Sequence, residues 1–523
     1  MSLDEADIHP SRDEFVAAAD RRVISVYAKL LADDITPVGA FRQLCGDRPG
    51  TFLFESAEQG TWSRWSFIGV NNVATLYGDH GESEWIVNTD RPIAGLPATG
   101  RPLEVLDETL RLLHTPRDPK LPPFTSGMVG YLGYELVRER ENIPDSNPDD
   151  IGVPEMVMML AGDLAVLDHH TGEIWLIANA INFDASAEHA DRAWQDAADR
   201  VRTMAEQLAE PHQPMATVRS NVDPAPAKRQ RSHDEFVAMV EAAKEHIRAG
   251  DIFQVVPSQR FEIDTTTADA LAIYRELRTS NPSPYLYLLQ LERSGKRFAL
   301  VGSSPEALVT VKDGLATTRP IAGTRPRGAN PTEDLALETE LLADEKERAE
   351  HLMLVDLGRN DLGRVCEPGT VEVTEFMHVH RYSHVMHLEA SVVGKIKPNL
   401  SALDVTMSCF PAGTLSGAPK VRAMQIIDEL ETSRRGPYGG VIGYFDFTGD
   451  SDAAIAIRTA LITDGKAYVQ AGAGIVADSV PDSEDLETRN KAAAVIGAVS
   501  RASGHRVLSV PAGSVDARKG DHA

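Results

Sequence analysis

The sequence predicts a globular protein in which short β-strands, some of them joined by tight hairpins, are combined with capped helices. Strand-like runs dominate residues 23–182, as at 51–55 and 164–167. Two Asp-Gly pairs, Asp313-Gly314 and Asp464-Gly465, lie between β-rich runs and are typical of two-residue type I′ turns. Hydrophobic residues make up 42% of the chain, which is enough to fill a buried core.

Charge and cysteine content exclude several functional classes. The 523 residues carry a formal net charge of −26, and such a surface repels nucleic-acid phosphates and anionic lipid headgroups. We therefore expect no nucleic-acid partner and no membrane partner, and no apolar run reaches the roughly 18 residues of a membrane span. The cysteines, Cys45, Cys366 and Cys409, are far apart and match no zinc spacing, which fits a cytoplasmic protein.

Two large regions are expected, with a linker between them. The first region, residues 23–210, is strand-rich and ends in a charged, Ala-rich helix that begins near residue 185. Residues 211–231 contain four prolines and the basic run K-R-Q-R, which indicates an exposed linker. The second region is 232–509, and the tail over 510–523 is expected to be disordered.

The second region begins with a capped helix. Ser232 and Glu235 have the spacing of a capping box, and Gly250 ends the helix. Further helices are expected over 344–357, 416–430 and 484–499, and the first of these has Asp344 as its cap.

The two hairpins predict which residues become neighbours in space. With a two-residue turn at Asp313-Gly314, Glu306 lies opposite Ile321. With the second turn at Asp464-Gly465, Arg458 lies opposite Ala471. Hairpin geometry thus groups Glu306 with P-I-A-G-T and Arg458 with A-G-A-G.

Two pairs of glutamates are spaced for one side of a helix. Glu347 and Glu350 are three residues apart in the helix that follows Asp344. Glu484 and Glu487 repeat this spacing in the last predicted helix. Taken alone, each pair is typical of a solvated acidic face. Together, however, the four carboxylates offer the all-oxygen ligands that a hard cation such as Mg²⁺ prefers.

The run A-G-A-G-I-V-A at 471–477 contains the pattern G-x-G-x-x-A, but it is not a dinucleotide fingerprint. That fingerprint needs a helix to start directly after the strand, whereas residues 478–481 cannot carry one. The glycines are either turn residues or positions where backbone N–H groups approach a carboxylate. Arg458, with its bidentate guanidinium, makes a carboxylate clamp a reasonable interpretation.

Taken together, these stretches resemble the chorismate-utilising enzymes, and within that family most closely component I of anthranilate synthase. The resemblance runs from about Phe52 to Ile496. Besides the acidic helix, its motifs are D-I-F-Q-V-V-P-S at Asp251, N-P-S-P-Y at Asn281, G-S-S-P-E at Gly302, P-I-A-G-T-R-P-R-G at Pro320, V-M-H at Val385, G-T-L-S-G-A-P-K at Gly413, P-Y-G-G at Pro437 and L-E-T-R-N-K at Leu486.

The resemblance implies an α+β fold of two large, mostly antiparallel β-sheets flanked by helices, with chorismate in a cleft between them. It also implies that Glu350 and Glu487 ligate Mg²⁺ while Glu347 and Glu484 place its waters. The metal would offset the charge of the ring carboxylate and the repulsion among the four acids.

The resemblance further implies roles for individual residues. Glu306 matches the general acid that protonates the C4 hydroxyl as ammonia adds at C2, and His387 and Thr414 match other catalytic positions. The positions that match substrate-binding residues are Gly323, Thr324, Tyr438, Arg458, Gly472, Ala473 and Gly474.

Two positions discriminate among related reactions. Isochorismate and salicylate synthases carry a lysine as general base where Gln254 stands, and glutamine cannot deprotonate water. Aminodeoxychorismate synthases often carry a nucleophilic lysine where Ala322 stands. Both differences favour amination at C2 and loss of pyruvate, which is a carbon–oxygen lyase reaction giving anthranilate. The alternatives are aminodeoxychorismate synthase component I, isochorismate or salicylate synthase, and a catalytically silent binding subunit.

The resemblance also implies partners and an inhibitor. No cysteine lies in a G-x-C-x-G setting, so the ammonia is expected from a separate glutamine amidotransferase subunit, in a homodimer or heterotetramer. The runs F-E-S at Phe54 and R-W-S at Arg64 resemble a tryptophan-feedback element of the first region. The inhibitor-binding residues are then Ser56, Pro284 and Tyr285.

Overall fold

The computed structural model describes residues 3–57, 64–89, 93, 95–184, 186–211, 216–219, 226–265, 269–381 and 385–507. The tail expected over 510–523 therefore lies outside the described residues. Within the described part of the chain, no helix is both long enough and apolar enough to cross a membrane.

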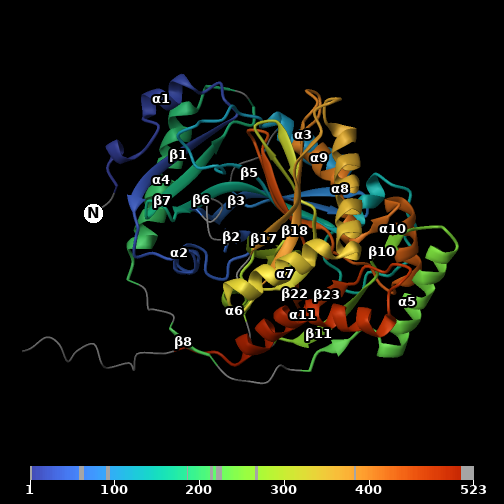
Figure 1. Ribbon diagram of the computed structural model, residues 1–523. Coiled ribbons are helices and arrows are strands. Elements are labelled where there is room, and N and C mark those ends of the chain that lie inside the picture. Colours follow the sequence, from blue (N-terminus) through green and yellow to red (C-terminus); the bar gives the residue numbers. More distant parts are fainter. Residues whose placement is uncertain are drawn as a thin grey trace, which may run out of the picture.

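Antiparallel strands and helices share the chain, which confirms the α+β class (Figure 1). The strands before residue 232 are β1 Val23–Leu31, β2 Thr51–Glu55, β3 Trp65–Asp79, β4 Glu82–Val87, β5 Gly127–Leu132, β6 Met156–Asp168, β7 Glu173–Ile181, β8 Thr217–Val218 and β9 Lys228–Arg229. The later strands are β10 Gln254–Val255, β11 Ser258–Asp264, β12 Tyr285–Arg293, β13 Lys296–Ser304, β14 Ala307–Lys312, β15 Leu315–Thr318, β16 Ile321–Pro326, β17 Glu372–Arg381, β18 Val385–Lys395, β19 Gly417–Ala418, β20 Val441–Asp446, β21 Ser451–Ile455, β22 Thr459–Thr463, β23 Lys466–Gly472 and β24 Arg506–Val507.

The helices cover the outside of this sheet network. They are α1 Arg12–Ala17, α2 Pro37–Leu44, α3 Pro102–Leu112, α4 Ala190–Ala209, α5 His233–Arg248, α6 Ala270–Ser280, α7 Pro331–Ala343, α8 Glu345–Val365, α9 Ala402–Cys409, α10 Lys420–Leu430 and α11 Pro481–Ser503. In Figure 1, α4 lies beside β1 and β7, and α6 and α11 lie side by side at the bottom of the view.

Strands from both regions of the chain pair with one another. β2 pairs with β12 and β5 pairs with β20, so the two regions share one hydrogen-bonded network. Part of the expected linker over 211–231 also forms strands, because β8 pairs with β24 and β9 pairs with β11. One core cluster, which includes Phe52, Leu289 and Leu300, contains no helical residue and lies where strands face strands.

The two Asp-Gly hairpins form with the predicted turns. Lys312 pairs with Leu315 across Asp313-Gly314, and Thr463 pairs with Lys466 across the second turn. The two aspartates have φ values of +49° and +51°, as expected for the first position of a type I′ turn.

The pairings predicted further along these hairpins are wrong. Glu306 is not paired with Ile321, because the β14–β15 ladder ends at Thr310 and Thr317. Arg458 is not paired with Ala471, because the β22–β23 ladder ends at Ala460 and Val469. In both cases the hairpin keeps the predicted register, but its ladder ends before it reaches the predicted pair.

Helix α8 begins where the sequence predicts. The Asp344 carboxylate accepts hydrogen bonds from the backbone N–H groups of Lys346 and Glu347, each at 3.1 Å. The helix then continues through Gly358 to Val365, past the predicted end at residue 357. Helix α10 begins at Lys420, later than predicted, because residues 417–418 form strand β19 and Pro419 precedes the helix.

The central strand β2 provides a test of this packing. Leu53 is fully buried in the core cluster that spans both regions, so Leu53→Ala should lower the free energy of unfolding by about 2–5 kcal/mol. Leu31, at the end of β1, is 76% exposed, and Leu31→Ala should change it by less than about 0.5 kcal/mol. Urea denaturation of both variants measures the difference, and equal effects would contradict the assigned core.

Candidate active site

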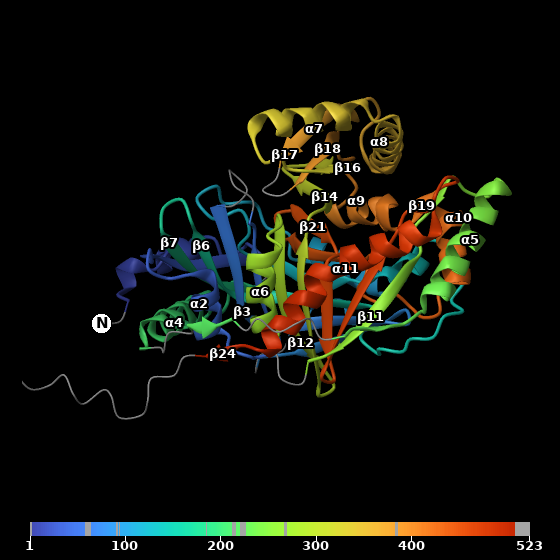
Figure 2. The ribbon, with the colours of Figure 1, turned by 60° about the horizontal axis from the view of Figure 1, so that its bottom comes forward.

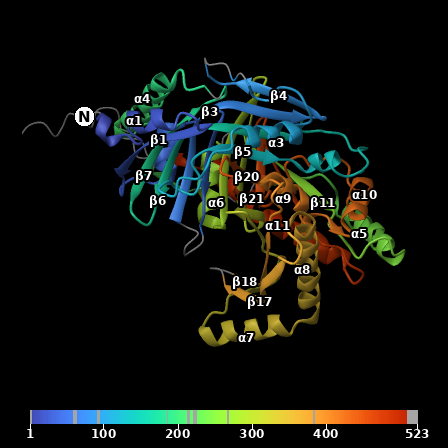
Figure 3. The same ribbon diagram turned by 90° about the horizontal axis from the view of Figure 1, so that it is seen from above.

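The candidate residues lie on two parts of the molecule. β16–β18 with α7 and α8 form a lobe that stands out from the body (Figures 2 and 3). Helix α8 packs against β16, β18 and α9, whereas α11 packs against α6, β11 and β23 of the body. Glu347 and Glu350 therefore belong to the lobe, while Glu484 and Glu487 belong to the body.

Glu306 lies between β13 and β14, where its carboxyl group is largely shielded from solvent. Its Oε1 accepts a hydrogen bond of 3.2 Å from Thr414 Oγ1. Burial raises the pKa of Glu306 to about 7, while the hydrogen bond from Thr414 and the charges of Arg458 and Lys491 act in the opposite direction. A carboxyl group with this pKa retains a proton for part of the time at neutral pH and can act as a general acid.

A small cavity opens beside Glu306, between α8 and the body. Its volume is about 60 Å³, and its lining includes Thr414, Pro320 and Leu357. Thr414 belongs to the 3₁₀ turn over residues 413–415, so that turn places the hydroxyl group against Glu306.

Tyr438, Arg458 and Gly472 come together close to Glu306. The Tyr438 hydroxyl is hydrogen-bonded to the backbone of Gly472, and a Cβ at Gly472 would lie 2.9 Å from that hydroxyl. Burial raises the pKa of Tyr438 to about 12 and lowers the pKa of Arg458. A neutral phenol and a guanidinium, both shielded from water, are the donors that a carboxylate ligand needs.

The expected carboxylate clamp also includes the backbone of Ala473 and Gly474, and both positions already contact other residues of the chain. The Ala473 N–H donates to the carbonyl of Pro257 at 3.2 Å. A Cβ at Gly474 would lie 2.7 Å from Nε2 of Gln254, so the Gln254 amide lies directly against this glycine. Gln254 is thus placed at the end of the expected clamp.

His387 lies across β16–β18 from Gly323 and Thr324. Its Nδ1 is 3.0 Å from both the Gly323 carbonyl oxygen and Thr324 Oγ1. Gly323 has a φ of +65°, and a Cβ there would lie 3.2 Å from Glu347 Oε2. Burial lowers the pKa of His387, so the imidazole is neutral at pH 7.

The four glutamates interact electrostatically across the lobe and the body. Burial raises the pKa of Glu350 and of Glu484, and the negative charge of Glu487 adds to both shifts. Glu347, which pairs with Arg325 at 3.7 Å, raises the pKa of Glu350 further. Lys346 and Lys491 oppose these pKa shifts but do not cancel them.

Lys491 is a candidate site residue that the sequence analysis missed. Its Nζ lies 2.6 Å from Glu487 Oε1 and donates a hydrogen bond of 3.0 Å to the Gly472 carbonyl. It therefore joins the acidic side chains to the clamp. The i, i+4 spacing of Glu487 and Lys491 on a helix predicts such an ion pair, so the sequence alone could have indicated this contact.

The chemistry of the four acids fits Mg²⁺, because they supply oxygen ligands and excess negative charge. Among the described residues, however, no three of them bring their carboxylate oxygens within 4.8 Å of one another. Asp79, His80 and Glu155 do approach this closely. There, Arg293 lies 3.0 Å from Asp79 and Arg434 lies 2.8 Å from Glu155, so arginines already neutralise both carboxylates.

The residues of the expected inhibitor site divide into two groups. Ser56 follows β2 and Tyr285 begins β12 at the same end of the β2–β12 pair, where the Ala57 N–H donates to the Ser283 carbonyl at 3.1 Å. Pro284 precedes Tyr285, and the Ser56 hydroxyl is buried with no hydrogen-bond partner among the described residues.

Arg64 and Ser66 already have partners at the β6–β7 turn. Arg64 pairs with Asp168 at 2.6 Å, and the Ser66 hydroxyl lies 2.7 Å from His169 Nε2.

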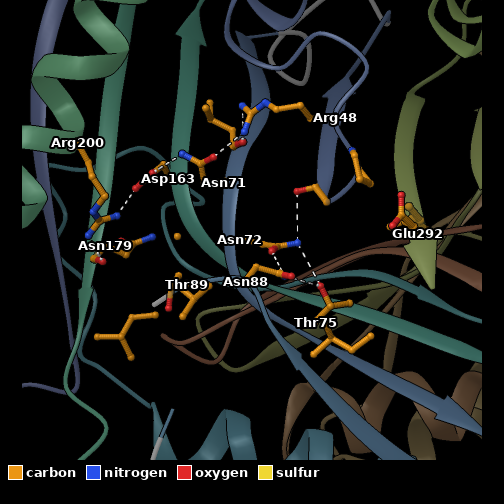
Figure 4. A pocket seen from close by; sticks show the side chains of 18 of the residues that line it. Arg48, Asn71, Asn72, Thr75, Asn88, Thr89, Asp163, Asn179, Arg200 and Glu292 are labelled. Atoms are coloured by element: carbon orange, nitrogen blue, oxygen red, sulfur yellow. Dashed lines mark hydrogen bonds and ion pairs between the residues drawn. The ribbon is translucent and has the colours of Figure 1, made fainter. Parts of the chain in front are cut away.

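A larger cavity lies elsewhere, lined mostly by the first region of the chain and also by Leu291, Glu292, Ser294 and Gly295 (Figure 4). Its volume is about 960 Å³, and polar side chains around it bond to one another. Asn71 donates to Asp163 at 2.7 Å and accepts from Arg48 at 2.9 Å, while Arg200 pairs with Asp163. We place the candidate site at Glu306, despite the smaller cavity there, because converging polar groups and shifted pKa values are typical of active sites.

Comparison with known proteins identifies relatives over nearly the whole chain. The family described as chorismate binding enzyme matches residues 50–497. Anthranilate synthase component 1 from Mycolicibacterium smegmatis is 54% identical over 497 residues, which is 94% of each chain. The protein of that name from Mycobacterium tuberculosis H37Rv is 53% identical over 500 residues, covering 94% of this chain and 96% of the relative.

Solved structures agree with the fold. Anthranilate synthase component I from Streptococcus pneumoniae superposes with a TM-score of 0.71 at 37% identity, covering 89% of this chain and 98% of that one. The menaquinone-specific isochorismate synthase from Escherichia coli gives 0.66 at 18% identity, covering 93% and 98%, and supports the fold alone. The chain therefore belongs to the chorismate-binding enzyme family, and within it to the branch of anthranilate synthase component I.

Proposed function

We propose that this chain converts chorismate and ammonia to anthranilate, pyruvate and water, the first committed step of tryptophan biosynthesis. The observation that carries the proposal is Glu306, a carboxyl group with a pKa raised to about 7 that is bonded to Thr414 and lies near Arg458. Such a group is suited to protonate a leaving hydroxyl. Identity of 54% to an enzyme named anthranilate synthase component 1 supports the same reaction.

In the proposed reaction, protonated Glu306 gives its proton to the C4 hydroxyl, which leaves as water while ammonia adds at C2. Pyruvate is then lost from the aminated intermediate, and the ring becomes aromatic. Arg458 and Tyr438 bind the enolpyruvyl carboxylate through N–H and O–H donors, which hold the ring in front of Glu306. The neutral His387 imidazole forms the opposite wall with Gly323 and Thr324.

The cofactor in this proposal is Mg²⁺. Glu350 and Glu487 would bind it, and Glu347 and Glu484 would hold its waters. When bound, it would offset the charge of the ring carboxylate. The raised pKa values of Glu350 and Glu484 support this assignment, because repulsion among carboxylates favours a cation.

Gln254 and Ala322 favour this reaction over the alternatives. The Gln254 amide lies against Gly474 but cannot deprotonate water, so isochorismate and salicylate formation are disfavoured. Ala322 is buried and has no nucleophilic group, which disfavours the aminodeoxychorismate reaction.

The ammonia in this proposal comes from a separate glutamine amidotransferase subunit, in a complex that is a homodimer or heterotetramer. All three cysteines are buried, and burial raises the pKa of each thiol, to about 12 for Cys45. A thiol with a raised pKa is a poor nucleophile, so this chain lacks the reactive cysteine that a glutaminase needs. The relatives' name, component 1, supports a second component.

Tryptophan is the proposed feedback inhibitor, bound beside Ser56, Pro284 and Tyr285. The buried Ser56 hydroxyl has a free hydrogen-bonding capacity, and the Tyr285 ring could pack on an indole. The site lies where a strand of the first region pairs with a strand of the second. A ligand there can shift the arrangement of the two regions by its differential affinity, typically about 1–3 kcal/mol.

The first test of the proposal is a direct assay. The purified chain, given chorismate, an ammonium salt and Mg²⁺, should form anthranilate, identified by fluorescence and mass. Glutamine in place of ammonium should give no product, and EDTA should abolish turnover. Glu487→Gln should lower kcat by about 10²-fold or more, because a charge that acts on the reacting groups is lost.

Glu345→Gln is the matched control, since Glu345 is exposed at the start of α8. Anthranilate made from glutamine by the pure chain would contradict the separate amidotransferase. Normal turnover of Glu487→Gln in EDTA would contradict the metal site.

A second prediction concerns pH. Because Glu306 must be protonated and its pKa is raised to about 7, kcat should fall as pH rises through about 7. Thr414 donates a hydrogen bond that lowers this pKa, so Thr414→Val should move the fall in kcat to higher pH. The profile is measured at a constant concentration of free NH₃. An unchanged midpoint in the variant would show that the titrating group is not Glu306.

A third prediction concerns inhibition. Ser56→Phe should fill the proposed tryptophan pocket and weaken inhibition at least about tenfold, which corresponds to about 1.4 kcal/mol of binding free energy. Turnover without tryptophan should stay within a few-fold. Ser294→Phe, on the exposed turn at the other end of β12, is the control. Unchanged inhibition of Ser56→Phe, or an equal loss of inhibition and turnover, would remove this site.

A further inference from the structure

We propose that Arg435 is a positioning residue that fixes three segments of the active site at once, an inference that rests on the proposed function. Arg435 lies between α10 and β20, three residues before Tyr438, and only 3% of it is exposed. A buried guanidinium is costly unless all its N–H groups have partners, so its surroundings show what it is fixed to.

The guanidinium bonds to the carbonyls of two segments that carry candidate site residues. Nη1 donates to the Leu415 carbonyl and Nη2 donates to the Val256 carbonyl, each at 2.7 Å. Leu415 follows Thr414 directly, and Val256 lies two residues after Gln254. These two segments also pair with each other through β10 and β19, and Arg435 bonds to both segments just beyond that strand pair.

The buried carboxylate of Glu431 also binds the Arg435 guanidinium. Glu431 accepts from Arg435 Nη2 at 2.7 Å and from Nε at 3.0 Å. The same carboxylate accepts from the backbone N–H of Ser258 at 2.8 Å and from its hydroxyl at 2.7 Å. Ser258 begins β11, the strand that pairs with Gly472 of the clamp. Glu431 therefore fixes Arg435 relative to the sheet.

Arg435 also contacts the tyrosine of the clamp. Its guanidinium lies 5.5 Å from the centre of the Tyr438 ring and 4.6 Å from the centre of the Tyr134 ring. The Arg435 carbonyl accepts from the Tyr438 N–H at 3.3 Å, and the Arg435 N–H donates to Glu135 at 2.9 Å. Both the side chain and the backbone of Arg435 thus set the position of Tyr438.

The neighbouring Arg434 provides a matched control. It pairs with Asp145 at 2.6 Å and with Glu155 at 2.8 Å, and neither carboxylate belongs to a segment that carries a candidate site residue. Lysine keeps the charge at either position. It cannot reproduce the planar fork that reaches two carbonyls and a carboxylate together, so the substitution should affect geometry only at Arg435.

The experiment compares Arg435→Lys with Arg434→Lys in the chorismate and ammonium assay, with thermal unfolding measured in parallel. Arg435→Lys should lower kcat/KM for chorismate by about 10–100-fold, mainly through KM, because a small displacement of the clamp loses binding and alignment. The kcat/KM of Arg434→Lys should stay within about threefold of the wild-type value, even where its unfolding temperature falls as much as that of Arg435→Lys.

A double-mutant cycle shows whether Arg435 acts through Tyr438. The combined loss in Arg435→Lys/Tyr438→Phe should be smaller than the product of the single losses. If Arg435→Lys does not fold, Ser258→Ala replaces it, removing one support of Glu431 with an expected several-fold rise in KM. Three results would each overturn the inference. They are equal kinetics of the two lysine variants, a loss in the double variant equal to the product of the single losses, and an unchanged KM in Ser258→Ala. Absence of wild-type turnover would instead overturn the proposed function.

Discussion

Antiparallel pairing between strands from distant parts of the chain is the constraint on which the active site depends. Leu132 of β5 lies opposite Val441 of β20, and this register brings the turn after β5 against the segment before β20. Tyr134 therefore packs on Arg435, and the Gly436 carbonyl accepts from the Tyr134 N–H at 2.8 Å. The clamp residues all belong to the second region, and the first region supports them through Tyr134.

The second constraint is the distribution of charge within the site. Glu306 is buried near the positive charges of Arg458 and Lys491, yet burial prevails and its pKa is raised. Glu350 has other carboxylates as neighbours, and there burial and repulsion act in the same direction. In the proposed reaction the same kind of side chain thus serves as a proton donor at Glu306 and as a cation ligand at Glu350, and the surroundings make the difference.

The sequence predicted features that depend on neighbouring residues, and it missed those that depend on distant ones. Asp344 caps α8 and the two Asp-Gly turns form as expected, because backbone conformation and local hydrogen bonds determine them. The expected pairing of Glu306 with Ile321 does not form, because the β14–β15 ladder ends at Thr310 and Thr317, and the length of a ladder depends on the strands packed around it. The site itself could be predicted only through long motifs shared with a family, since no local pattern places Thr414 against Glu306.

The lobe formed by α7, α8 and β16–β18 has a mechanical consequence. The proposed cation ligands are divided between it and the body, so an ion that binds both also fastens the two together. Part of its binding free energy then becomes work against whatever motion separates them. A lobe that resists this movement strongly would therefore bind the ion more weakly than a lobe that moves easily.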